Sequence, residues 1–174
     1  IPVRPDRRIT DHIAAIGDIT PGPALAHKAS AEAIVAAEAL CGRKVAFQPA
    51  AIPAVVFSDP EVASAGLTAD EAKAAGIDVK LANFPLSASG RAKTLNISNG
   101  FLQIVADQAG DAVLGVHIVG PHASDLIAEG VLAIEMGATL EDLALTIHPH
   151  PTLSEQFLEA AHLGLGQPIH LSVL

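Results

Sequence analysis

The sequence is short of several residue types that particular functions require. Its single cysteine, Cys41, excludes an internal disulfide, a dithiol redox centre and a cysteine-rich zinc site. It has no tryptophan or tyrosine and only five phenylalanines, which leaves no aromatic platform for stacking bases or sugars. Lysine and arginine number 10 against 19 acidic residues, and the resulting formal charge of −9 argues against nucleic acid as a partner.

Long apolar runs are also missing, although half of the residues are apolar. No stretch of about 18 uncharged apolar residues occurs, so we expect no membrane span. The opening, IPVRPDRRITD, has neither the apolar core of a signal peptide nor the amphipathic basic pattern of a transit peptide, and we expect a piece cut from a longer chain. A single thiol suits a reducing compartment, so the cytoplasm is the expected location.

The first part of the chain, residues 1–48, has the pattern strand, loop, helix. Residues 13–16 predict a short buried strand, and the sequence ITPGP that soon follows excludes regular structure. Residues 25–41 are rich in alanine and glutamate, with apolar residues at helical spacing, and Gly42 stands where a C-cap glycine belongs. A helix is therefore predicted, with Cys41 as a small buried apolar residue.

The second part, residues 49–174, passes from strands to helices. Strands are predicted in the stretches IPAVVFSDP, VASAG, VKLANFPL, GFLQIVAD and AVLGVHIVG. Helices are predicted in LTADEAKAAG, ASDLIAEGVLAIEMG, TLEDLALT and TLSEQFLEAAHLG. Strands followed by bunched helices predict the α+β class, with an antiparallel sheet and helices packed on one face.

A rigid turn carrying two histidines separates the last two predicted helices, in the stretch TIHPHPTLSEQF at 146–157. The prolines fix their own φ angles and force His148 and His150 into extended geometry, so the two rings leave the chain in different directions. Glu155 is five residues after His150 and would lie in the first turn of the following helix, within reach of that ring. A carboxylate on one imidazole nitrogen raises the basicity of the other, as a general base near neutral pH requires.

Local sequence leaves three other interpretations of this turn open. Thr152 and Glu155 match the T-x-x-E capping box, which could be the whole role of the glutamate. His148 and His150 could be turn residues without chemistry. A metal site is the third alternative, but the diverging rings and the lack of a companion ligand cluster favour no metal.

The stretch TIHPHPTLSE resembles the C-terminal signature of the dihydrolipoamide dehydrogenase family, which are FAD-dependent disulfide oxidoreductases. The resemblance implies that His150 is the catalytic base and Glu155 its partner. It extends over nearly the whole chain, through IAAIGDITPGPALAHKASAEA, PAVVFSDPEVASAGLT, GRAKT and GVHIVGPHASDLIAEGVLAIE. It implies that residues 1–48 end the FAD-side region and that residues 49–174 form the interface, or dimerisation, domain.

The resemblance also implies cofactors and partners for a full-length enzyme. Asp18 would accept a hydrogen bond from the ribityl chain of FAD, and the helix beginning at Leu25 or Ala26, with His27 in its first turn, would stabilise negative charge on the flavin ring. NAD would be the electron acceptor. The enzyme would be a homodimer acting on dihydrolipoamide, carried by the lipoyl domain of a 2-oxo acid dehydrogenase complex.

Several parts of such an enzyme are missing from these residues. There is no G-x-G-x-x-G turn, no C-x-x-x-x-C redox pair and no second dinucleotide-binding unit. We therefore expect this piece alone to be inactive and to retain no FAD. Two rival functions are a non-catalytic dimerisation module and another flavin disulfide reductase with a different substrate.

Overall fold

A computed structural model describes residues 1–171, and the chain divides into two compact units. They are Ile1–Pro49 and Ala50–Leu174, a division one residue after the one drawn from the sequence. No helix in the described residues has the length and apolar character needed to cross a membrane.

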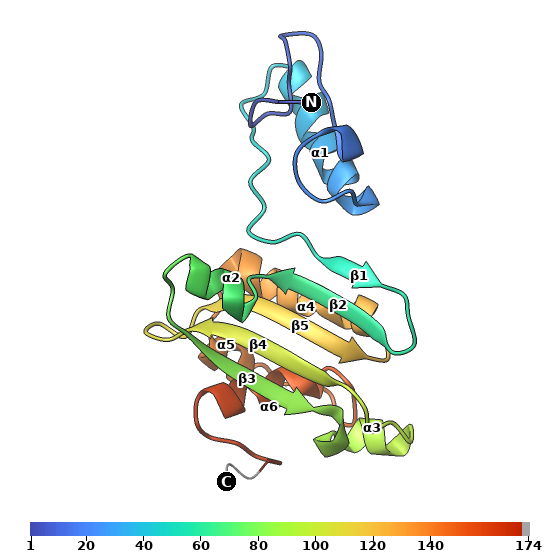
Figure 1. The fold of residues 1–174 in the computed structure, drawn as a ribbon, viewed down its shortest axis with the longest axis vertical. Coiled ribbons are helices and arrows are strands. Elements are labelled where there is room, and N and C mark those ends of the chain that lie inside the picture. The colour runs from blue at the N-terminus through green and yellow to red at the C-terminus, as the bar shows by residue number, and fades with distance from the viewer. Residues whose placement is uncertain (172–174) are drawn as a thin grey trace. The chain divides into compact units, whose positions relative to one another are not determined.

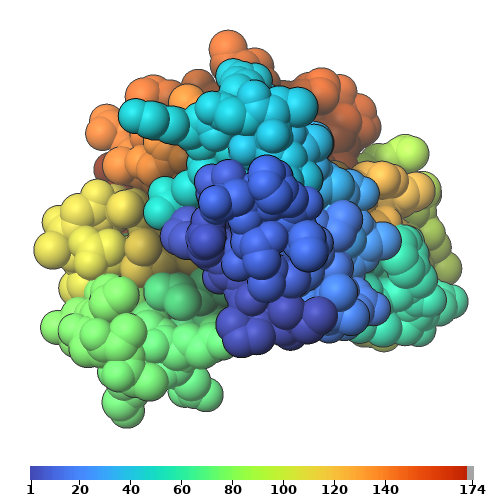
Figure 2. Space-filling model, turned by 90° about the horizontal axis from the view of Figure 1, so that it is seen from above, coloured from blue at the N-terminus to red at the C-terminus, as the bar shows by residue number. Residues whose placement is uncertain are grey.

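The first unit is built on helix α1, Ala26–Leu40, which contacts the short 3-10 turn η1, Gly17–Ile19. Figure 2 shows this unit in space-filling form, in blue to cyan. Helix α1 lies within the stretch predicted to be helical and ends as expected. Cys41 is the C-cap, and Gly42 has a φ of +87°, in the left-handed region that glycine tolerates.

Two predictions for this unit are wrong. Residues 13–16 form no strand, because they have only one isolated bridge, between Arg8 and Ala14, and a strand needs a continuous hydrogen-bonded partner. The two isoleucines of this segment are accordingly exposed rather than buried. Cys41 is exposed as well, since it follows the last turn of α1 and lies beyond the face that the helix buries.

The second unit is an α+β fold on a five-stranded sheet, as predicted (Figure 1). The strand order is β1-β2-β5-β4-β3, and every neighbouring pair is antiparallel. The strands are β1 (Ala54–Val56), β2 (Glu61–Gly66), β3 (Val79–Pro85), β4 (Phe101–Asp107) and β5 (Val113–Gly120). Buried and exposed residues largely alternate along β3, as expected for an edge strand with one face on the core.

Three helices cover one face of this sheet, the far face in Figure 1. They are α4 (Ala123–Met136), α5 (Leu140–Leu145) and α6 (Glu155–Gly164). The shorter elements α2 (Ala69–Ala74), η2 (Leu86–Ala88) and α3 (Gly90–Thr94) connect strands. Two of the helix starts are fixed by reciprocal capping boxes, Thr68 with Glu71 and Thr139 with Asp142.

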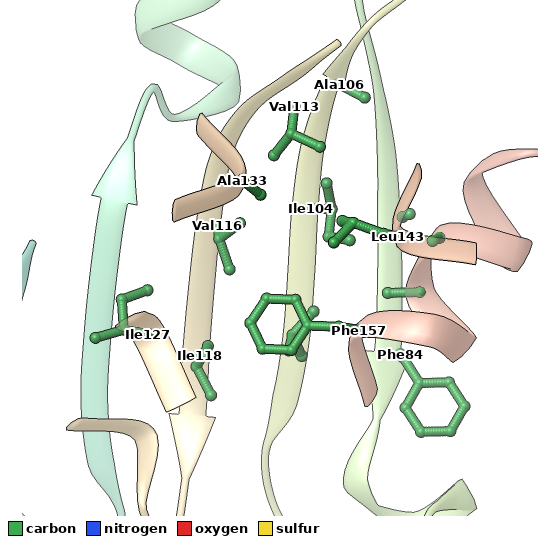
Figure 3. Close-up of a cluster of buried hydrophobic side chains, with 14 of the residues drawn as sticks. Phe84, Ile104, Ala106, Val113, Val116, Ile118, Ile127, Ala133, Leu143 and Phe157 are labelled. Atoms are coloured by element: carbon green, nitrogen blue, oxygen red, sulfur yellow. The ribbon is translucent and has the colours of Figure 1, made fainter. Parts of the chain in front are cut away.

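The core lies between the sheet and these three helices (Figure 3). Phe157 of α6 is fully buried and reaches across β4 of the sheet. Gly130 lets α4 approach β5 closely, since a Cβ atom there would lie 2.9 Å from the Val116 Cβ. Fully burying a side chain such as Phe157 contributes roughly 1.5–3 kcal/mol. This packing fixes both ends of the segment that joins α5 to α6.

Candidate functional site

The histidine turn joins the end of α5 at Leu145 to the start of α6 at Glu155. Helix α6 packs on β3 and β4, and α5 packs against α6, so the turn is held at both ends. Its two histidines diverge, as predicted. The ring of His148 bonds to Glu129 of α4, whereas the ring of His150 bonds to Glu155.

His150 and Glu155 form a hydrogen-bonded pair in which the Nε2 side of the imidazole ring is exposed. The Nδ1 atom of His150 is 2.8 Å from Oε1 of Glu155. A carboxylate only accepts hydrogen bonds, so Nδ1 carries the hydrogen and Nε2 keeps its lone pair in the neutral ring. The His150 side chain is 77% exposed, and no described residue bonds to Nε2. The arrangement is that of a base whose accepting nitrogen is accessible to a substrate.

The Glu155 carboxylate is ionised in this pair. Its burial raises the pKa, but the N–H of Thr152, which donates to Oε2 at 2.7 Å, and the His150 ring outweigh that effect. The pKa of Glu155 therefore lies below its ordinary 4.5. An ionised carboxylate on Nδ1 stabilises the charged imidazolium that forms when His150 accepts a proton.

The capping-box interpretation describes only part of what Glu155 does. Its carboxylate accepts from the Thr152 N–H, as a capping box requires. Among the described residues, the reciprocal bond from the Glu155 N–H to Thr152 Oγ1 is absent, because this hydroxyl donates to the Pro149 carbonyl instead. The N-cap of α6 is Ser154, which makes no side-chain capping bond. One carboxylate oxygen of Glu155 is thus hydrogen-bonded to the backbone, and the other is hydrogen-bonded to the ring of His150.

His148 has partners that sequence reasoning missed. Its Nε2 is 2.7 Å from Glu129 Oε1, its Nδ1 is 2.9 Å from the Thr146 carbonyl oxygen, and the side chain is 4% exposed. Glu129 precedes His148 by 19 residues on a different element. Local spacing therefore carries no signal for this pair.

His150 and Glu155 line a cleft of about 180 Å³ that also contains a second histidine-carboxylate pair. In that pair, His170 Nδ1 is 2.5 Å from Oε1 of Glu159, one turn after Glu155 on α6. Lys93 completes the charged lining of the cleft. No cluster of three or more potential metal ligands occurs within residues 1–171.

The predicted flavin-side residues occupy adjacent elements of the first unit. Asp18 is exposed on η1, and Leu25 is the N-cap of α1 with no side-chain cap. Ala26 and His27 are exposed in the first turn of α1. Asp18 and the first turn of α1 thus lie on two elements that contact each other, and their roles in binding FAD stay predictions.

A buried ionic network holds η1 against α1. Lys28 Nζ donates to the Gly17 carbonyl at 3.1 Å and to Thr20 Oγ1 at 2.9 Å, and it lies 3.2 Å from Glu32 Oε1. Glu32 also accepts from the Gly17 N–H at 2.7 Å and from Arg7 at 2.9 Å. Sequence reasoning missed this network, although the i,i+4 spacing of Lys28 and Glu32 was a usable signal.

Comparison with protein families matches residues 52–161 to the pyridine nucleotide-disulphide oxidoreductase dimerisation domain. The dihydrolipoyl dehydrogenase of Geobacillus stearothermophilus is 57% identical over 165 residues, which are 95% of this chain and 35% of that protein. The dihydrolipoyl dehydrogenase of Halobacterium salinarum is 54% identical over 164 residues, 94% of this chain and 35% of that protein. The chain thus spans about a third of the length of these curated relatives.

Solved structures resemble the fold over most of the chain. LpdA from Mycobacterium tuberculosis has a TM-score of 0.86 at 29% identity, over 92% of this chain and 36% of that one. The flavoprotein disulfide reductase RclA from Escherichia coli has a TM-score of 0.84 at 23% identity, over 92% of this chain and 38% of that one, and supports the fold alone. From its match over residues 52–161, the chain belongs to the pyridine nucleotide-disulphide oxidoreductase dimerisation domain family.

Proposed function

We propose that this chain is part of a dihydrolipoamide dehydrogenase and supplies both its dimer contact and its general base. The observation that carries the proposal is the His150–Glu155 pair, with an ionised carboxylate on Nδ1 and an accessible Nε2. The dihydrolipoyl dehydrogenases at 57% and 54% identity support this choice of substrate. The dihydrolipoyl group would reach the enzyme on a lipoyl domain, in a reducing compartment such as the cytoplasm.

The step assigned to His150 is removal of a thiol proton. Dihydrolipoamide is a dithiol, and only the thiolate is nucleophilic. His150 Nε2 accepts the proton, and the thiolate attacks an enzyme disulfide outside this chain, forming a mixed disulfide and releasing one enzyme thiolate. Glu155 stabilises the imidazolium until the proton leaves for solvent.

The proposed function assigns part of the flavin site to the first unit. Asp18 offers an exposed carboxylate to the ribityl hydroxyls, and the N-terminus of α1 at Leu25–Ala26 offers positive dipole charge to the ring. FAD, when bound, supplies the two-electron acceptor for the enzyme dithiol, and NAD takes the electrons onward. The pyrophosphate-binding turn would come from another part of the enzyme.

The dimer contact is assigned to exposed apolar residues on α4 and on the segment around α5. Leu132 is 61% exposed, Met136 73% and Ile147 95%. Two of them, Leu132 and Met136, line a groove of about 400 Å³ together with Leu143. Exposed apolar side chains gathered in this way mark an interaction surface. The family match favours a second copy of the chain as the occupant, in an isologous contact.

The dimer contact predicts the mass of the chain in solution. We expect light scattering at tens of micromolar to give about twice the 17.7 kDa of the single chain. Leu132→Glu should produce monomers, because the like charges that it introduces into both copies of an isologous contact cost several kcal/mol. Leu81→Glu, at an exposed leucine of β3, is the matched control and should leave the dimer intact. A monomeric parent chain, or equal dissociation by both variants, would contradict the assignment.

A substrate comparison tests the catalytic proposal against its rivals. In the longer enzyme that contains this chain, we expect NAD-linked oxidation of dihydrolipoamide with kcat/KM at least about 10²-fold above that for glutathione as the thiol substrate. Preference for another disulfide or dithiol would indicate a reductase of different specificity. A folded, flavin-free dimer without either activity would support the non-catalytic dimerisation module.

A further inference from the structure

We propose that the hydrogen bond between Glu129 and His148 positions the general base, so that His148 is a positioning residue for His150. This inference rests on the proposed function of His150. The first histidine of the turn then has a defined task, although it touches neither substrate nor cofactor in that proposal.

The ring of His148 is held on both nitrogens by acceptors. Nδ1 lies 2.9 Å from the Thr146 carbonyl oxygen and Nε2 lies 2.7 Å from Oε1 of Glu129. The His148 side chain is only 4% exposed, so both contacts are sheltered from water. A charge-assisted hydrogen bond in a site sheltered from water is stronger and more directional than an exposed one.

This pair attaches the turn to a helix that does not adjoin it in sequence. Glu129 belongs to α4, which packs on β2 and β5. The next anchor along the turn is Thr152, whose Oγ1 donates to the Pro149 carbonyl at 2.7 Å and whose N–H donates to Glu155. His150 thus lies between an anchor on α4 and an anchor on α6.

The prolines alone do not place His150. They fix their own φ angles and restrict the residues before them, but they leave the whole turn free to pivot against the helices. The ring of His150 is largely exposed, with Glu155 its hydrogen-bond partner among the described residues. Its position relative to α4 is therefore set through His148, two residues earlier. In the proposed dimer, the groove that both Glu129 and His148 line is covered, and water is removed from the pair.

The test uses Glu129→Gln, His148→Gln and the double variant in the longer enzyme. We expect each single change to lower kcat for dihydrolipoamide oxidation about 10-fold, with KM little changed, because displacement of a base by a fraction of 1 Å acts on the transition state. The double variant should match either single one, because the two residues act as a unit. NADH oxidation by an artificial acceptor should be unchanged in all three. Hydrogen exchange at the Thr152 amide should become faster in each.

Asp125→Asn is the matched control, because Asp125 lies 3.7 Å from His122 in an exposed histidine-carboxylate pair at the start of the same helix. It should leave kcat within about twofold, as expected for exposed pairs. Unchanged kcat in both single variants overturns the inference while leaving the proposed function intact. Losses that multiply in the double variant, or artificial-acceptor activity falling in parallel, also overturn it. If His150→Gln is itself without effect, the proposed function fails and this inference fails with it.

Discussion

Replacing His150 by glutamine in the longer enzyme is expected to lower kcat for dihydrolipoamide oxidation by at least about 10²-fold, the lower end of what a general base contributes. Glutamine can still bond to Glu155 through its amide, but it has no nitrogen that accepts a proton at neutral pH. The substrate thiol would then lose its proton only to water. Steady-state turnover with saturating NAD measures the loss.

The change of Glu155 to glutamine should have a smaller effect than that of His150. An amide oxygen can still accept a hydrogen bond from the His150 ring, but it cannot stabilise the imidazolium by charge. The pKa of Glu155 lies below 4.5, so the carboxylate is ionised at every higher pH. The same steady-state assay at neutral pH, where Glu155 of the parent enzyme is ionised, compares the losses in the two variants.

Electron transfer provides the control for both variants. Oxidation of NADH by an artificial acceptor requires no proton transfer from a dithiol, so it should survive the change of His150 or Glu155. If turnover of dihydrolipoamide survived His150→Gln, the base assignment would be wrong. If both activities fell together, the turn would have a structural role only.

The sheet and its helices could be predicted because local patterns and tertiary packing agree. Alternation along β3, the apolar run of β4 and the glycine that ends α4 each act within a few residues. The same holds for Thr68 with Glu71, a capping box visible as T-x-x-E and present in the structure. Where the structure-forming interaction spans only a few residues, the sequence carries the signal.

Two of the failures depend on partners distant in sequence. Residues 13–16 have the apolar character of a strand but no strand to pair with, so they remain irregular. The pairing of His148 with Glu129 spans 19 residues and depends on how α4 packs on the sheet. The pairing of His150 with Glu155 spans five residues across a helix start, which is why local sequence could predict it.

The buried network of the first unit leads to the second large expected effect. Glu32→Gln should lower the free energy of opening of α1 by about 3–5 kcal/mol, the usual result of removing one partner of a buried ion pair. Glu32 is fully buried, and its carboxylate accepts from the Gly17 N–H and faces both Lys28 and Arg7. A neutral amide would leave two cations with no counter-charge in the network.

The pKa of Glu32 is consistent with this expectation. Burial raises it, but the Gly17 N–H, Lys28 and Thr20 together outweigh burial and hold the pKa below its ordinary 4.5. Because the folded-state pKa is depressed, this carboxylate stabilises the fold above pH 4.5, and its contribution is lost as the pH falls through the folded-state value. The difference between parent and variant should therefore shrink on acidification.

Hydrogen exchange at the amides of Ala36 and Ala39, buried positions of α1, measures the free energy of opening directly. Glu38→Gln on the same helix is the matched control, because its partner Arg43 is exposed and such pairs contribute at most about 1 kcal/mol. In the longer enzyme, Glu32→Gln should also weaken retention of FAD, because the network fixes the turn that carries Asp18. Equal effects of the two glutamate variants on exchange would show that burial of the network does not stabilise this unit. Unchanged FAD retention despite faster exchange would separate the network from the cofactor site.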